Sequence, residues 1–258
     1  MTELIDLTIS DACATLTLSR SEKLNSLTPS MLSLLTKYLD EIESRTDIRV
    51  VVLTADGHKA FCVGADIHAW ADLSPLDMWR QWVVPGHRIF DRLAQLRMPV
   101  VALINGLALG GGLELAAAAD IRIAASNAKF ALPEAKVATT PGWSGSQRLV
   151  KEMGPGWVKA MALAGQWWDA QQAKEQGFLQ EVCELDELHM VGQRWVSNIV
   201  QLAPISVQIN KQMINAAQGE GVAAAIESLG GAVAAATQDA QEGKQSFFEK
   251  RTGQYQGQ

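Results

Sequence analysis

Three consecutive glycines, Gly110, Gly111 and Gly112, stand just before Glu114 in the most apolar stretch of the chain. They follow a Val-rich run and precede an Ala- and Leu-rich one, which predicts a buried strand that turns into a helix. Backbone N–H groups at a helix N-terminus stabilise negative charge that develops on an oxygen atom. A tight turn, in which glycine permits positive φ and close packing, is the alternative. Nucleotide-phosphate binding loses support because neither G-x-G-x-x-G nor G-x-x-x-x-G-K-[ST] is present.

Two carboxylates accompany the glycines. Glu114 stands among leucines and alanines, where an isolated carboxylate is costly to bury. Either it is hydrogen-bonded or functional, or its charge stabilises the first helical turn, and the sequence alone leaves both readings open. Glu134 directly follows Pro133 and an apolar run, and the glycine-bearing loop at residues 140–149 then enters a helix. A further glycine-bearing segment, residues 60–67, follows another predicted strand.

The composition excludes several classes of function. The 258 residues are 48% hydrophobic and 19% charged, as in an ordinary globular protein with one large core. The net charge of −6, with no long basic run, argues against a nucleic-acid partner, because phosphate binding needs clustered Lys and Arg. Glycines and Glu114 interrupt the apolar stretch 99–119, so no membrane span is expected there.

Cysteine and histidine usage indicates a reducing compartment and no metal site. The cysteines are odd in number, far apart and without a C-x-x-C pair, which argues against disulfides and zinc. Acidic residues occupy the N-terminus, where a secretory or mitochondrial leader would carry basic ones, so a cytoplasmic location is expected. The cysteines are Cys13, Cys62 and Cys183. The histidines, none of which has the spacing of metal ligands, are His58, His68, His87 and His189.

Short β-rich runs alternate with helical patterns in the first half of the chain, which implies parallel strand pairing with right-handed crossovers. Thr28 as N-cap and Pro29 at the first helical position begin a helix that is predicted to end at Ser44. Strands are predicted at residues 4–9, 14–18, 49–54, 99–104 and 120–124, and the first two form a hairpin.

After about Gly145 the strand signals disappear, and helical patterns follow one another to the end of the chain. Helices this rich in Ala and Leu often carry subunit contacts. The sequence therefore predicts an α/β fold with a C-terminal helical region. The helices are predicted at residues 157–164, 170–176, 184–201, 205–218, 222–237 and 239–251.

Five segments of the chain form an ordered set: residues 22–27 (Glu-Lys-Leu-Asn-Ser-Leu), 60–67, 105–116, 130–149 and 247–251 (Phe-Phe-Glu-Lys-Arg). Together they resemble the enoyl-CoA hydratase/isomerase superfamily, also called the crotonase family, over essentially the whole chain. The resemblance implies a spiral of ββα units. It further implies a crotonase-like α/β core at residues 1–195 and a C-terminal helical trimerisation region at residues 196–258.

The resemblance assigns the chemistry to five residues. In that family two backbone N–H groups hold the thioester carbonyl, and they correspond to Ala65 and Gly111. Two fixed donors stabilise the enolate-like oxygen, and the loss of one costs about 3 to 4 kcal/mol in comparable sites. The hydratases of the family add two glutamates, which correspond to Glu134 for the Cα proton and Glu114 chiefly for the water. The N–H group of Gly142 corresponds to a position that helps to orient the water.

The same resemblance implies an acyl-CoA substrate whose coenzyme A enters as part of the substrate, so no separate cofactor and no metal are expected. Asp66 could alternatively be a turn residue and Lys250 a solvated cation at a helix end. The family also associates as homotrimers or as hexamers made of two trimers. The residues assigned to the coenzyme and acyl groups are Lys23, Leu24, Ala65, Asp66, Ile67, Trp143, Phe247 and Lys250.

The sequence departs from the family pattern at the acyl end of the site. Trp143 and Ser144 stand where small residues are usual, and Ala138 stands where glycine is commoner. An unusual or bulky acyl group is one consequence. A segment with three further tryptophans either covers the acyl chain or supplies core and subunit contacts. These are Trp70, Trp79 and Trp82.

The presence of both Glu114 and Glu134 favours an enoyl-CoA hydratase, which adds water across the double bond of a 2-enoyl-CoA. The alternative within the superfamily is an isomerase, or a dehydratase of a functionalised acyl-CoA, which Trp143 and Ser144 favour. An alternative from another class is a non-catalytic acyl-CoA-binding or RNA-binding relative. The negative charge argues against RNA, and the intact glutamate pair argues against lost turnover.

Overall fold

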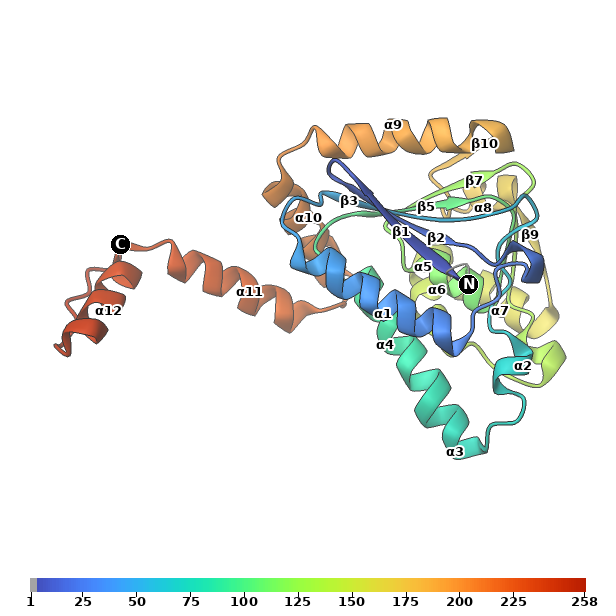
Figure 1. The fold of residues 1–258 in the computed structure, drawn as a ribbon, viewed down its shortest axis with the longest axis horizontal. Helices are drawn as coiled ribbons and strands as arrows, with labels where there is room; N and C mark the ends of the chain where they lie inside the picture. Colours follow the sequence, from blue (N-terminus) through green and yellow to red (C-terminus); the bar gives the residue numbers. More distant parts are fainter. Residues whose placement is uncertain (1–3) are drawn as a thin grey trace. The chain divides into compact units, whose positions relative to one another are not determined.

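The computed structural model describes residues 4–258, which form two compact units, residues up to 208 and residues 209–258. The first unit contains all the strands found in the described residues, and they form two sheets (Figure 1). No helix in the described part of the chain is long and apolar enough to cross a membrane.

The larger sheet has six strands in the order β1-β2-β3-β5-β7-β10, counted over residues 4–258. The hairpin pair β1 and β2 is antiparallel, and the remaining neighbours are parallel. The predicted hairpin and the predicted parallel pairing are therefore confirmed. The strands are β1 (Ile5–Ser10), β2 (Cys13–Leu18), β3 (Val50–Ala55), β5 (Val100–Ile104), β7 (Ile121–Ala125) and β10 (Glu181–Cys183).

Four short strands form the second sheet, in the order β4-β6-β8-β9 within the part of the chain described. Three times in succession the chain enters the larger sheet, turns into the smaller one and then leaves through helical segments, as β3–β4, β5–β6 and β7–β8 show. This repetition is the expected spiral of ββα units. The short strands are β4 (Ala60–Cys62), β6 (Leu107–Leu109), β8 (Lys129–Ala131) and β9 (Trp168–Asp169).

Both faces of the larger sheet are buried at its central strands β3 and β5, which explains their Val-rich runs without alternation. Val50 and Val52 of β3 belong to a core cluster with α9 (Leu188–Val200), which Figure 1 shows along one face of the sheet. Val51 and Leu53, which point to the opposite face, belong to the main core with α1 (Pro29–Ser44). Helix α1 begins as predicted, since the Thr28 side chain accepts a hydrogen bond from the Met31 amide at 3.3 Å.

Further helical segments of the first unit connect the strands. The helix that begins at Gly145 directly follows the loop at residues 140–144. The segments are η1 (Ser21–Lys23), α2 (Ile67–Trp70), α3 (Pro75–Asp77), the π-helical η2 (Met78–Val83), α4 (Val84–Ala94), α5 (Gly111–Ala117), η3 (Glu134–Val137), α6 (Gly145–Met153), α7 (Pro155–Ala164), α8 (Ala170–Glu175) and η4 (Leu185–Glu187).

Helix α10 (Pro204–Ala217) carries the chain from the first unit into the second, which continues with α11 (Val222–Ala235) and α12 (Gln238–Glu249). The side chains of α11 are not buried at any of its positions, although the helix is rich in Ala and Val. Phe247 and Phe248 of α12 are 79% and 80% exposed. The C-terminal helices are thus confirmed.

The prediction that strands end at about Gly145 is wrong. Residues Glu181–Cys183 form β10, which pairs in parallel with β7 at the edge of the larger sheet. Trp168 and Asp169 form β9, which pairs antiparallel with β8. Each strand is only two or three residues long, too short for a periodic pattern to develop, and it exists because a neighbouring strand offers unpaired backbone groups.

Candidate active site

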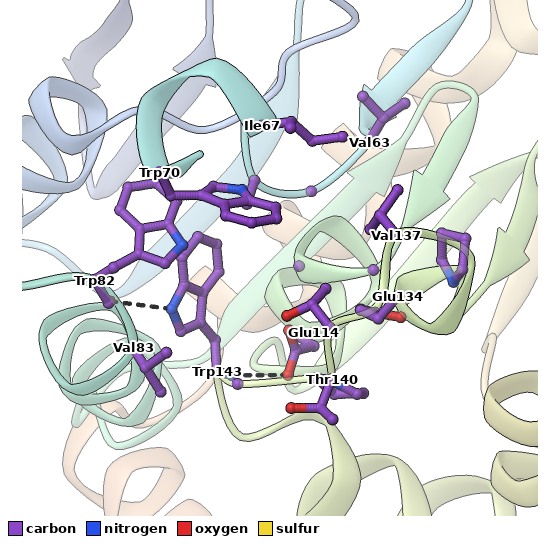
Figure 2. A pocket seen from close by; sticks show the side chains of 18 of the residues that line it. Val63, Ile67, Trp70, Trp82, Val83, Glu114, Glu134, Val137, Thr140 and Trp143 are labelled. Carbon is purple, nitrogen blue, oxygen red and sulfur yellow. Dashed lines mark hydrogen bonds between the residues drawn. The ribbon is translucent and has the colours of Figure 1, made fainter. Parts of the chain in front are cut away.

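A cavity of about 490 Å³ lies where the two glycine-bearing turns meet. Its lining comes from the turn after β4, from η2, from the start of α5, from η3 and from the loop that precedes α6. Figure 2 shows three indole rings on one side of this cavity, with Glu114 and Glu134 across from them. The remaining lining is mostly apolar. The cavity therefore offers carboxylates to a substrate that is otherwise surrounded by hydrocarbon.

Glycine is required where the two turns approach each other. Gly64 has φ of +92°, and a Cβ there would lie 3.0 Å from the amide nitrogen of Gly111. Gly112 packs so closely on β4 that a Cβ would lie 1.9 Å from the carbonyl oxygen of Cys62. Because side chains cannot fit, the backbone amides of both turns lie at the cavity.

The backbone of Ala65 presents its amide to the side opposite Leu27. The bridge between these residues uses the Leu27 amide, which donates to the Gly64 carbonyl at 2.8 Å, and the Asp66 amide, which donates to the Leu27 carbonyl at 2.8 Å. In an extended chain successive amides alternate in direction, so the Ala65 N–H group points the other way. Gly111 is the first residue of α5, where an amide has no acceptor within the helix. Both residues line the cavity.

Glu114 is 2% exposed, and its carboxylate is held by the loop that precedes α6. Its Oε1 atom accepts hydrogen bonds from the amides of Trp143 and Gly145, each at 2.8 Å, and the Gly142 amide also faces the carboxylate. Burial raises the pKa of Glu114, and these backbone N–H groups counter that rise. The alternative in which Glu114 merely stabilises a helical turn does not account for donors from a segment about thirty residues away.

Glu134 is placed differently. Its two carboxylate oxygens are buried without a hydrogen-bond partner, at the first position of η3. Burial raises the pKa of Glu134 to about 7, and the charge of Glu114 adds to the rise. A Cβ on Gly110 would lie 2.8 Å from its Oε1 atom, so the carboxylate lies directly beside the glycine run.

The indole of Trp143 is packed into the core beside the cavity. It lies 5.1 Å from the Trp82 ring and 5.2 Å from the Phe90 ring, measured between centroids, and its Nε1 donates to the Trp82 carbonyl at 3.4 Å. Gly86 of α4 makes room for it, because a Cβ there would lie 2.2 Å from the Trp143 Nε1 atom. Trp143 therefore serves both as core and as cavity wall.

The other tryptophans were expected either to cover the acyl chain or to supply core and subunit contacts, and they differ in position. Trp70 and Trp82 line the cavity, and the Nε1 atom of Trp70 is buried without a partner. Trp79 is 56% exposed and is not part of the cavity lining, so it cannot cover an acyl chain in this arrangement.

The residues assigned to coenzyme A lie in both units. Ile67 and Ala65 line the cavity, whereas Lys23 and Leu24 lie at the end of η1 outside its lining. Asp66 caps α2 through the His68 amide at 3.1 Å and forms an ion pair with Arg20 at 2.7 Å, so it is a turn residue as well. Phe247 belongs to α12 of the second unit, and Lys250 is the residue that caps this helix at its C-terminus.

Several residues that shape the site were not predicted from the sequence. Gly145 lies against Glu114 so tightly that a Cβ would be 2.3 Å from its Cγ atom, and Gly64 sets the turn before Ala65. Gly64 directly precedes Ala65, and Gly145 lies two residues after Trp143. Their positions close to assigned residues were the signal that the sequence offered. Met78 and Val83 of η2 carry no comparable signal and are brought to the cavity only by the fold. Over residues 4–258, no group of three or more His, Cys, Asp or Glu side chains could hold a metal ion.

Comparison with known proteins gives consistent matches over nearly the whole chain. A family model described as enoyl-CoA hydratase/isomerase matches residues 8–258. A short-chain-enoyl-CoA hydratase of Clostridium acetobutylicum is 36% identical over 240 residues, which cover 92% of this chain and 92% of that protein. An (E)-benzylidenesuccinyl-CoA hydratase of Thauera aromatica is 34% identical over 255 residues, which cover 98% of this chain and 99% of that protein. The crystal structure of an enoyl-CoA hydratase from Bacillus anthracis matches with a TM-score of 0.82 and 34% identity, covering 99% of this chain and 100% of that one.

Proposed function

Because the chain belongs to the enoyl-CoA hydratase/isomerase family, we propose that it is an enoyl-CoA hydratase that uses Glu114 and Glu134 as its acid–base pair. The observation that carries this proposal is the contrast between the two carboxylates. Glu114 accepts amide hydrogen bonds, which favour its ionised form, whereas Glu134 is buried without a donor, which favours its neutral form. One shared proton on Glu134 leaves a base and an acid side by side.

The reaction follows from this arrangement. The amides of Ala65 and Gly111 hold the thioester oxygen. Ionised Glu114 takes a proton from a water molecule whose oxygen attacks Cβ, so the carbon–carbon π bond breaks and charge moves to the thioester oxygen. Neutral Glu134 then gives its proton to Cα, and the product is a 3-hydroxyacyl-CoA. Transfer of the proton from Glu114 to Glu134 restores the starting state. Gly142 supports this step by facing the water-activating carboxylate.

The cavity walls support a compact apolar acyl group. Trp70, Trp82 and Trp143 close one side with indole rings, and the cavity measures about 490 Å³. The Thauera aromatica relative is named for a substrate that carries a benzylidene group, which supports testing an aryl substrate here. Short-chain and aryl-substituted 2-enoyl-CoA esters are therefore the substrates to test.

A direct assay tests the proposal. The purified protein is incubated with crotonyl-, hexenoyl-, octenoyl- and cinnamoyl-CoA, and the loss of conjugated-enoyl absorbance is followed. Product mass distinguishes hydration, which adds one water, from double-bond isomerisation, which adds none. Turnover of none of these esters would contradict the assignment, and an unchanged product mass would support the isomerase alternative.

The coenzyme A assignments and the assembly belong to the same proposal. Lys23, Leu24, Asp66 and Ile67 are proposed to contact the coenzyme, together with Phe247 and Lys250 of the helical unit. The exposed apolar side chains of α11 and α12 support association of this unit in a homotrimer or a hexamer. The cytoplasmic location and the absence of a separate cofactor remain predictions.

A further inference from the structure

Behind the carboxylate of Glu114 lies a cluster of polar side chains that the hydration chemistry does not use. Ser144 stands between Trp143 and Gly145, the two residues whose amides hold Glu114. It is 4% exposed, and its φ of 74° lies in the left-handed region, which is unfavourable for a residue with a side chain. The loop therefore holds a strained backbone at the point that aims both amides.

The Ser144 side chain is fixed by α4. Its hydroxyl donates to Asp91 Oδ1 at 2.7 Å and lies 3.2 Å from His87 Nδ1. Arg148 of α6 donates to the same Asp91 oxygen at 2.7 Å, and His87 Nε2 lies 3.1 Å from Asp91 Oδ2. Asp91 thus ties the loop and the first turns of α6 to a helix that contributes no catalytic group.

We propose that Asp91, acting through the Ser144 hydroxyl, is a positioning residue that keeps the amides of Trp143 and Gly145 aimed at Glu114. The inference rests on the proposed hydratase function. Burial raises the pKa of Glu114, and fixed amide donors oppose that rise by favouring the ionised form. A displacement of about 1 Å at such a site is costly for turnover. Asp91 is not part of the cavity lining, so it acts on the site through the loop that it holds and through His87, with which it pairs.

Loss of the hydrogen bond between Ser144 and Asp91, here called the anchor, is expected to change the pKa of Glu114. If the amides turn away, ionised Glu114 loses its donors and its pKa rises further. Because Glu114 must be ionised to accept a proton from water, the acidic limb of the kcat profile moves to higher pH. The other titratable groups that face Glu114 are Glu134 from η3 and His87 from α4, and both remain in place in the variants below.

The test compares Ser144→Gly and Ser144→Ala with Ser146→Ala, an exposed serine two residues further along α6. Ser144→Gly is the sharper variant, because glycine adopts positive φ without strain and the protein keeps its fold while it loses the anchor. We expect kcat to fall about tenfold in both Ser144 variants, with KM changed less than twofold and the acidic midpoint moved to higher pH. Ser146→Ala should retain the parent kcat and pH profile.

Two outcomes overturn the proposal. One is a parental kcat and acidic midpoint in Ser144→Gly. The other is an Asp91→Asn substitution that lowers kcat by the same factor in the Ser144→Gly background as in the parent, since Asp91 would then not act through Ser144. A ¹³C NMR titration of the Glu114 carboxyl in ligand-free protein provides a readout without turnover, so failure of the anchor is distinguishable from failure of the hydratase assignment.

Discussion

Glu114 and Glu134 differ in their hydrogen-bonding surroundings. Two amides at 2.8 Å stabilise the negative charge of Glu114, while neither buried oxygen of Glu134 has a hydrogen-bond partner and only its own amide lies near enough to lower its pKa. Close carboxylates share protons as a pair, and the hydrogen bonds decide which member holds the proton. At the scale of single residues, the proposed division into base and acid therefore rests on backbone donors and not on residue type.

Glutamine variants test this division. Glu114→Gln and Glu134→Gln should each lower kcat for crotonyl-CoA by at least about 10²-fold, because each removes one proton-transfer group. Steady-state kinetics on the purified variants measures the effect. Glu187→Gln, an exposed glutamate of η4, is the matched control and should retain parental kinetics. Parental activity in both active-site variants would contradict the mechanism.

The pKa of Glu134 also predicts a pH dependence of stability. Burial raises this pKa from its ordinary value of 4.5 to about 7, so the folded state binds the proton more tightly than the unfolded state. The contribution of Glu134 to the free energy of unfolding is therefore largest below pH 4.5 and decreases as the pH rises to about 7. Urea denaturation of the parent and of Glu134→Gln across this range measures it. The difference in stability between the two should shift in favour of Glu134→Gln with rising pH, and a constant difference would refute the buried, donor-free carboxyl.

At the scale of elements, the site depends on close backbone contact between two strand-to-helix turns. Gly64 precedes Ala65, and Gly111 begins α5. The backbones of Gly64 and Gly111 are so close that a Cβ on Gly64 would lie 3.0 Å from the Gly111 amide nitrogen. The smaller sheet supports this contact, because β4 and β6 are hydrogen-bonded neighbours. The geometry of the proposed oxyanion donors therefore depends on the pairing of these short strands.

A glycine substitution tests this contact. Gly64→Ala should destabilise the protein by about 1 to 3 kcal/mol, since alanine is strained at φ of +92° and its Cβ would lie 3.0 Å from both the Gly111 amide nitrogen and the Leu109 carbonyl oxygen. It should also lower kcat/KM by displacing a donor. Thermal unfolding and kinetics measure the two effects.

Gly156→Ala in α7 is the control for that substitution, because its Cβ would meet nothing within 4 Å. Alanine in a helix should leave stability unchanged or raise it by about 0.4 to 1 kcal/mol. Equal stability of the two alanine variants would show that the turns do not need their close contact.

At the scale of the whole molecule, the two units bury their apolar side chains to different extents. The first unit holds both sheets and both core clusters, whereas α11 of the second unit buries none of its side chains. Large exposed apolar groups such as Phe247, Phe248 and Ile226 gather on the second unit. Exposed apolar surface of this kind is typical of protein–protein contacts.

A double substitution tests the role of these side chains in assembly. Light scattering of the parent should give the mass of a trimer or hexamer, and Phe247→Ser with Phe248→Ser should reduce the assembled fraction. Leu163→Ser, which replaces an 81% exposed residue of α7, is the control and should leave the mass unchanged. A monomeric parent would refute the proposed assembly.

The sequence by itself determined the elements whose signals are local. Thr28 and Pro29 define the start of α1, and the Val-rich runs define β3 and β5, because caps and burial patterns depend on residues close along the chain. The ordered motifs assign Glu114 and Glu134 to one family pattern without reference to any distance. The strands β9 and β10 were not predictable, since their pairing partners lie about forty to sixty residues away.

Only the tertiary structure decided how the two carboxylates differ. The amides that hold Glu114 come from a loop about thirty residues further along the chain, and Asp91 of α4 anchors that loop through Ser144. Trp143, whose type suggested only a reshaped pocket, is seated by Gly86 and Phe90 of the same helix. These contacts arise because the loop before α6 packs against both α4 and α5. No local pattern specifies them, since they join residues that only the fold brings together.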